Sequence, residues 1–344
     1  MYGWSPLPRT LAAALRDVVH KEARVRLSAV ADLERLCGGE GRDAAVAALV
    51  AALSGDVDLE VRAAAALALA DARAERALDA LIRAAERDEP RVRQLALVAV
   101  GELAGSGNQE AQRVVQLALA EAAPALRFQA LLAASHVLPA HDLVHVLVEA
   151  CADGEARVRY LTCRLLEQLG QAASDEAVRA RVARALDGLF QDEDDDVRLC
   201  AAVALAQRGS ELAREQLVRA LNDGTPMQPE DEQAAIELCA EHELRAALPG
   251  LRERAWGRWY KATSPFVFQA RVSLARLGDE RARQDILKGL SSWSRPVRTR
   301  AAVAAGLAGL QEARARLLAM QSDESQADSY SVAEALRALD GAPI

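Results

Sequence analysis

A Val-Arg pair, each time followed by a stretch rich in alanine, recurs along almost the whole chain. Apart from one gap of about two periods after Arg198, the copies lie 30 to 39 residues apart, a spacing typical of stacked structural repeats. Such repeats bury their apolar faces against their neighbours, so the chain grows in one direction instead of around a single core. The pairs are Val25-Arg26, Val61-Arg62, Val92-Arg93, Leu126-Arg127, Val158-Arg159, Val197-Arg198 and Val297-Arg298, with degenerate copies at Val267 and Val332.

The composition favours helices over strands in these repeats. Hydrophobic residues make up 51% of the 344 residues but aromatic residues only 3%, so alanine, leucine and valine must build the core. Alanine and leucine form helices readily, whereas strands prefer β-branched and aromatic side chains. We therefore predict an all-α fold, a right-handed α-solenoid of about ten helix-turn-helix repeats.

The charge and the cysteines argue against several classes of protein. A formal net charge of −8 and a pI near 5.4 disfavour a nucleic-acid partner, because affinity for phosphates comes mainly from lysine and arginine. The five cysteines include no Cys-x-x-Cys pair, which disfavours a disulfide framework and a structural zinc site. The sequence shows neither the pattern of a signal peptide nor an apolar stretch of membrane-spanning length. We therefore expect a cytoplasmic protein without membrane insertion.

Residues 141–170 show the repeat unit most clearly. Apolar residues recur at helical spacing over 141–151, Asp153 and Glu155 mark a turn, and a second helix is predicted over 156–170, ending at Gly170. Acidic residues recur in the same turn of other repeats, where a carboxylate can cap the free N–H groups at the start of a helix. These acids are therefore interpreted as structural and not as catalytic.

The turn segments resemble those of a known family. SGDVDLEVRAAAALALADA (54–72) and RDEPRVRQLALVAVGELAG (87–105) resemble bacterial HEAT repeats of the kind also found in phycobilin lyases, and the resemblance covers nearly the full chain. The Trp, Gly-Tyr and Phe-Pro landmarks of tetratricopeptide repeats do not recur. The resemblance implies a ladder between neighbouring repeats, in which each turn acid pairs with an arginine of a second helix; a ligand-binding row of arginines is the alternative. The implied ladder residues are Arg26, Arg62, Arg93, Arg127, Arg159, Arg198 and Arg298.

The regularity of the repeats changes along the chain. We predict a single solenoid over 1–344, with regular repeats over 1–221, irregular repeats over 222–278, and C-terminal repeats with a cap over 279–344. Residues 222–233 are predicted to form an extended loop with Pro226 and Pro229, and Pro249 is expected to bend or interrupt its helix. An irregular unit inside a regular array is a place where function can override the folding pattern.

The second helices carry an apolar stripe. With the valine of each pair as position zero, positions 3, 4, 7 and 8 are predicted to face the core, and positions 2 and 6 the concave groove. Apolar residues occupy most of these groove positions, centred on Phe128, Tyr160 and Leu199. We predict that another molecule covers this apolar stripe: a partner helix or peptide, a hydrophobic ligand, or a second copy of this chain. The alternative is that neighbouring helices bury these positions against one another.

Residues 251–269 combine aromatic and basic side chains. Five of the 12 aromatic residues lie between 256 and 268, interleaved with arginine and lysine. The combination is typical of a protein-binding hot spot, a base-stacking surface or a site for an anionic cofactor, and a local core of large rings is the alternative. Because the chain is acidic, we favour a protein partner. The predicted contact residues of stripe and cluster together are Phe128, Tyr160, Leu199, Trp256, Arg258, Trp259, Tyr260 and Phe268.

Motifs for metal binding and catalysis are weak in this sequence. His141, His145 and Glu149 share one face of the helix predicted over 141–151, but a fixed third ligand and a second shell are not evident. The acidic run at 191–196 lacks the glycine and the terminal glutamate of an EF-hand loop. No glycine-rich phosphate loop or nucleophile motif occurs. We therefore predict no metal, no cofactor and no enzymatic activity.

These features together predict a non-catalytic scaffold or adaptor that holds a partner protein or peptide on its groove and aromatic unit. One alternative, implied by the resemblance to phycobilin lyases, is a lyase-like or chaperone-like enzyme acting on a bound chromophore or modified protein. A second alternative is a DNA-repair protein resembling the HEAT-like alkylpurine DNA glycosylases. The concave face of that family is basic, whereas the corresponding positions here are largely apolar.

Overall fold

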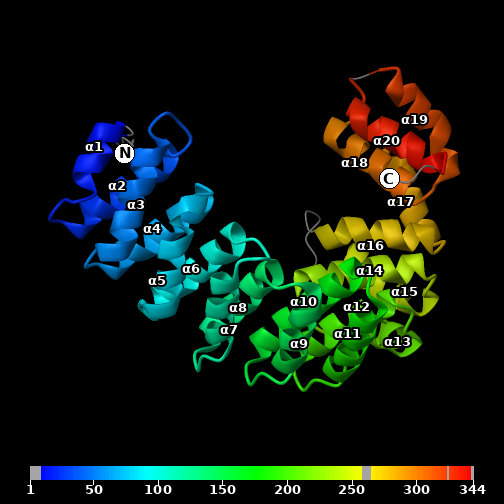
Figure 1. The fold of residues 1–344 in the computed structure, drawn as a ribbon. Helices are drawn as coiled ribbons and strands as arrows, with labels where there is room; N and C mark the ends of the chain where they lie inside the picture. The colour runs from blue at the N-terminus through cyan, green and yellow to red at the C-terminus, as the bar shows by residue number, and fades with distance from the viewer. Residues whose placement is uncertain (1–8, 258–264, 324, 342–344) are drawn as a thin grey trace. The chain divides into compact units, whose positions relative to one another are not determined.

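The chain folds into α-helices joined by short turns (Figure 1). The computed structural model describes residues 9–257, 265–323 and 325–341, and none of these residues lies in a β-strand. They divide into two compact units, Met1–Ala185 (unit 1) and Leu186–Ile344 (unit 2). None of the described helices is both long and apolar enough to cross a membrane. The predicted all-α class is confirmed.

Unit 1 is built from α-helices that alternate between a first and a second helix of each repeat. One turn of 3₁₀ helix, η1 (Glu75–Ala77), leads into α5, and α11 (Glu176–Leu189) continues into unit 2. The other helices of unit 1 are α1 (Leu11–Asp17), α2 (Ala23–Leu36), α3 (Arg42–Gly55), α4 (Leu59–Asp71), α5 (Leu78–Arg87), α6 (Pro90–Leu103), α7 (Gln109–Leu119), α8 (Pro124–Val137), α9 (Ala140–Ala150) and α10 (Ala156–Ala172).

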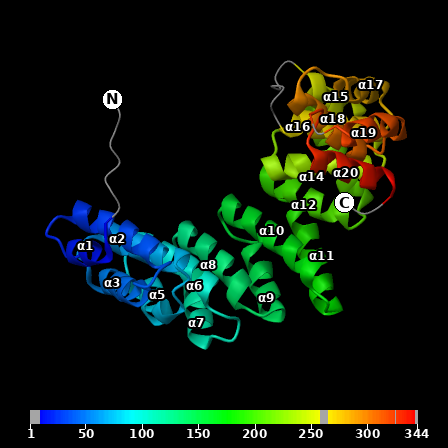
Figure 2. The same cartoon turned by 90° about the horizontal axis from the view of Figure 1, so that it is seen from above.

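Helices of unit 1 lie side by side in chain order in both views (Figures 1 and 2). Each second helix packs on its own first helix and on the second helix of the next repeat. The second helices α4, α6 and α8 contact one another far more extensively than the first helices α3, α5 and α7 do. The predicted stack of helix pairs is therefore present within this unit, with the second helices as its tighter layer.

Small residues allow this close approach of the second helices. The fourth residue after the valine of each pair is an alanine in α2, α4, α6 and α8, and each of these alanines is fully buried. In α6, a Cβ added to Gly101 would lie 3.0 Å from the Cα of Ala133 in α8. A larger side chain at such positions would push the backbones apart.

Unit 2 contains the remaining repeats. Its second helices α14 and α16 pack closely together, as do α18 and α20, whereas α16 and α18 contact each other much less. The 3₁₀ turns η2 (Arg245–Ala247) and η3 (Gln311–Ala313) precede α15 and α19. The α-helices of unit 2 after α11 are α12 (Asp195–Gln207), α13 (Glu211–Asp223), α14 (Pro229–Glu241), α15 (Leu248–Trp256), α16 (Pro265–Arg276), α17 (Glu280–Gly289), α18 (Arg295–Leu307), α19 (Arg314–Gln321) and α20 (Ser329–Leu339).

Several predicted boundaries were wrong. Helix α10 continues two residues past Gly170, and the loop predicted over 222–233 is confined to residues 224–228. Pro229 and Pro249 both lie in the first turn of a helix, where the missing N–H group leaves no intrahelical hydrogen bond unmade. Neither proline therefore interrupts its helix. Gly224 ends α13 in the left-handed conformation with φ of 68°, which glycine adopts without a steric cost.

The core positions of the second helices also differ from the prediction. Position 5 is buried, as at Leu97 and Leu131, whereas Ser28 at position 3 is exposed. Positions 4 and 8 are buried in α2, α4, α6 and α8 as predicted, and position 7 is buried in α4, α6 and α8. The buried face of these helices therefore extends to position 5 and not to position 3.

Candidate functional site

In unit 1, the arginines of α2, α4, α6 and α8 each reach the turn of the next repeat. The Nε and Nη2 atoms of Arg127 in α8 each lie 2.7 Å from a carboxylate oxygen of Asp153, and Nη1 donates to the carbonyl oxygens of Glu121 and Ala122. One guanidinium group thus holds its own turn and the following turn together. The described pairs of this kind are Arg26 with Asp56, Arg62 with Asp88, Arg93 with Glu121, and Arg127 with Asp153.

Arg159 of α10 is buried and donates to the carbonyl oxygen of Asp153 in its own turn, as the other unit 1 arginines do in theirs. The two ladder arginines of unit 2 make different contacts. Arg198 pairs with Asp195 in the first turn of its own helix. Arg298 donates to backbone carbonyl oxygens of residues 292, 293, 325 and 326. In the following turn, Arg298 therefore meets backbone carbonyl oxygens, whereas the equivalent arginines of α2, α4, α6 and α8 meet a carboxylate.

The second helices of unit 1 expose apolar side chains at positions 2 and 6. Leu27 in α2 is 39% exposed and Leu67 in α4 is 42% exposed, and the apolar residues at these positions in α6, α8 and α10 are half-buried. The exceptions are Ala63, which is buried, and the polar residues Gln94 and Arg164. Positions 2 and 6 are four residues apart and share one face of a helix, and these helices pack side by side. We call this set the second-helix face, and its members are Leu27, Leu67, Val98, Phe128, Leu132 and Tyr160.

Leu199 does not share the exposure of these residues. It is only 4% exposed and lies in α12, whose residues from Leu199 to Ala206 are all buried. The expectation that Leu199 lines an open surface is therefore corrected, because its side chain is already covered within the chain. Of the predicted stripe, Phe128 and Tyr160 stay partly accessible.

In the aromatic and basic segment, Trp256 is held by polar contacts with α17. Its indole Nε1 donates to Asp285 at 3.0 Å, and the guanidinium group of Arg281 lies 4.0 Å from the centre of its ring. Phe268 is half-buried in α16. The other predicted residues of this cluster, Arg258, Trp259 and Tyr260, lie outside the described residues.

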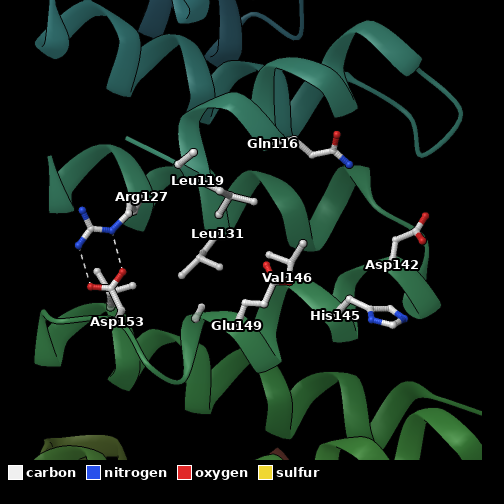
Figure 3. A pocket seen from close by; sticks show the side chains of 12 residues that line it. Gln116, Leu119, Arg127, Leu131, Asp142, His145, Val146, Glu149 and Asp153 are labelled. Atoms are coloured by element: carbon white, nitrogen blue, oxygen red, sulfur yellow. Dashed lines mark hydrogen bonds and ion pairs between the residues drawn. The ribbon is translucent and has the colours of Figure 1, made fainter. Parts of the chain in front are cut away.

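A cavity of about 510 Å³ opens between α7, α8 and α9 in unit 1 (Figure 3). The pair of Arg127 and Asp153 closes one end, His145 lies at the other, and Leu131 and Val146 form an apolar floor between them. A comparable cavity of about 660 Å³ contains Arg62 and Asp88 two repeats earlier. The cavity is thus a recurring space between repeats rather than a feature of one repeat.

Two of the three residues considered for metal binding, His141 and His145, make other contacts in unit 1. Guanidinium nitrogens of Arg181 lie 2.7 Å from both ring nitrogens of His145, so a cation already occupies the space beside this ring. His141 pairs with Asp142 at 3.0 Å, and Glu149 is exposed. No group of three or more His, Cys, Asp or Glu side chains in the described parts of the chain is arranged to hold a metal ion.

Sequence reasoning missed a buried ion pair in unit 2. Arg254 in α15 is 2% exposed, and its Nε lies 2.6 Å from the Oε1 of Glu232 in α14. Glu232 follows Asp231, and these two residues stand where the repeat spacing after Val197 places the next Val-Arg pair. The absence of a Val-Arg pair at this position of the repeat could have indicated that an acid takes the place of the usual arginine.

The comparisons with known proteins agree with this architecture. Residues 8–101 match the family model described as HEAT repeats. These residues therefore form HEAT repeats. No curated protein sequence matches this chain significantly.

Solved structures show the same kind of fold at low sequence identity. YibA of E. coli is 17% identical over 78% of this chain and 93% of its own, with a TM-score of 0.52. Kap121p bound to Ste12p is 12% identical over 97% of this chain with a TM-score of 0.52, and the match covers 40% of that chain. The complex of CpcE and CpcF of phycocyanin lyase from Nostoc sp. is 20% identical over 80% of this chain and 98% of that chain, but its TM-score is 0.44. Identities this low show the fold alone, and a shared fold does not imply a shared function.

Proposed function

We propose that this HEAT-repeat protein is a binding scaffold that holds a segment of a partner protein on the second-helix face of unit 1. One observation carries the proposal. Each of five consecutive second helices has a partly exposed apolar side chain at position 2, at position 6 or at both, where a purely solvated helix surface would carry charged or polar residues.

The energetic basis of binding is the water-exposed apolar area of these side chains. Covering apolar surface releases roughly 25 cal/mol for each Å² removed from water, so several leucine-sized contacts are needed to offset the entropy lost on association. The second helices are held by arginine contacts and close alanine packing before any partner arrives. The partner segment then loses mainly its own freedom, which favours a rigid repeat array as a scaffold.

Replacing Leu67 with glutamate is expected to weaken partner capture at least tenfold. The change places a charge in the middle of the second-helix face, where a bound apolar segment would have to desolvate it. Leu67 is 42% exposed, so its replacement leaves the core of α4 intact. The measurement is quantitative affinity purification from the native cell with wild-type and variant protein as bait.

Leu117 offers a matched control for this experiment. It is 48% exposed on the first helix α7, so Leu117→Glu makes the same chemical change in the other helix layer. We expect this control to retain the wild-type set of partners. Equal capture by wild type and both variants would contradict the proposed binding face, and equal loss in both variants would show a general effect of the added charge.

A further inference from the structure

Helix α16 departs from the packing rule that the second helices of the regular repeats share. The fourth residue after the valine is small and buried in the regular repeats, namely Ala29, Ala65, Ala96, Ala130, Thr162, Ala201 and Ala301. In α16 the fourth residue after Val267 is Arg271. An arginine cannot fit where alanine lets two helix backbones approach, and α16 accordingly has few contacts with α18.

The space left between α16, α17 and α18 is a pocket of about 280 Å³. Its lining includes the apolar side chains of Phe268 in α16, Ile286 in α17 and Ala301 in α18, together with Arg271 and Arg300. Small-molecule sites in proteins usually measure roughly 300–1,000 Å³. The pocket is therefore suited to a single side chain of a peptide rather than to a large cofactor.

Both arginines have unused hydrogen-bonding capacity. The Nε of Arg271 is buried without a hydrogen-bond partner, and its Nη2 donates only to the carbonyl oxygen of Ala255 at 3.2 Å. Arg300 is exposed and has no hydrogen-bond or ion-pair partner in the described part of the chain. A buried donor without a partner is costly, so the pocket favours a ligand that supplies an acceptor.

The charge around the pocket is opposite to that of the whole chain. Residues 265–303 contain eight arginine and lysine residues and three acidic residues, whereas the full chain has a net charge of −8. Most nearby cations are engaged, since Arg283 pairs with Glu280 and Glu312, and Arg298 binds backbone carbonyl oxygens. Arg271, which lies 6.0 Å from the centre of the Trp256 ring, and Arg300 have no carboxylate partner in the described part of the chain and thus define a local site for one anionic group.

We propose that this pocket binds an acidic peptide segment, with one bulky apolar side chain in the pocket and an adjacent carboxylate between Arg271 and Arg300. The carboxylate of Asp285 also lines the pocket, and it accepts a hydrogen bond from the Trp256 indole. Two arginines without a carboxylate partner, beside one such acid, leave room for a single carboxylate and disfavour a polyanion such as a nucleic acid, which requires many cationic contacts. This site is separate from the second-helix face of unit 1 and does not depend on it.

A random dodecapeptide library displayed on phage tests the proposal with the full-length protein. We expect wild type to enrich peptides that carry Leu, Ile or Phe next to Asp or Glu. Arg271→Ala and Arg300→Gln should each lower the affinity of an enriched peptide at least tenfold, as measured by fluorescence anisotropy. Arg276→Gln, which removes an exposed arginine of the same segment outside the pocket, should retain the wild-type affinity.

The variants also separate binding from folding. Arg271→Ala installs the residue that other repeats carry at this position, so its melting temperature should equal or exceed that of wild type while peptide binding is lost. Enrichment of peptides without an acidic residue, or unchanged affinity in both pocket variants, would overturn the proposal. Tighter binding of a single-stranded oligonucleotide that depends on the same arginines would assign the site to nucleic acid instead.

Discussion

Replacing Glu232 with alanine is expected to lower the free energy of unfolding of unit 2 by about 3–5 kcal/mol, the usual cost of leaving one partner of a buried ion pair uncompensated. The loss falls on Arg254, which is 2% exposed and donates to Glu232 at 2.6 Å and to the carbonyl oxygen of Leu221 at 2.7 Å. The arginine would then remain buried with its charge unbalanced.

Urea unfolding followed by tryptophan fluorescence measures this loss, because Trp256 lies two residues after Arg254. Glu232→Gln is the matched control, since it keeps a hydrogen-bond acceptor and the side-chain volume but removes the charge. We expect the free energy of unfolding of Glu232→Gln to lie between that of wild type and that of Glu232→Ala. A loss below about 1 kcal/mol for Glu232→Ala, the range of an exposed ion pair, would show that Arg254 reaches solvent or another acid.

Replacing Arg127 with alanine is expected to destabilise unit 1 by about 1–3 kcal/mol at neutral pH, because it leaves the carboxylate of Asp153 without its main partner. Hydrogen bonding from Arg127 lowers the pKa of Asp153 below its usual value, against the opposing effect of burial. A carboxyl group with a lowered pKa in the folded state stabilises the fold above its ordinary pKa of about 3.9. That contribution is lost as the pH falls through the lower folded pKa.

The difference between wild type and Arg127→Ala should therefore shrink as the pH is lowered below about 4. Urea titrations followed by circular dichroism at several pH values measure it. Arg83→Ala, which removes an exposed arginine of α5, is the control and should cost less than about 0.5 kcal/mol. A difference that stays constant down to pH 3 would mean that Arg127 stabilises unit 1 through its backbone acceptors and not through Asp153.

The repeat spacing predicts the helix pairs of this protein well because it is a local property. Each repeat contains its own helix signals and contacts only its neighbours, so alternation of two helices can be recognised without long-range information. The boundaries were harder to predict. Pro229 was predicted to lie in a loop and Pro249 to bend or interrupt a helix. Both lie in the first turn of a helix, where proline is well accommodated.

The candidate site was predicted less completely than the fold. Position 2 of a second helix is exposed at Leu27 but buried at Leu199, and only packing between helices decides which of the two occurs. The departures from the repeat were present in the sequence at Glu232 and Arg271. Their roles depend on the tertiary structure. Glu232 is paired with the buried Arg254, and Arg271 lines a pocket.

Site-specific photo-crosslinking in the native cell tests the proposed binding face most directly. A benzophenone amino acid at position 67 lies on the second-helix face, and one at position 117 is equally exposed on a first helix. If the second-helix face holds a partner segment, position 67 yields a discrete covalent adduct to one protein sequence and position 117 does not. Adducts at 117 alone, or none at 67 when the same partner co-purifies, would contradict it.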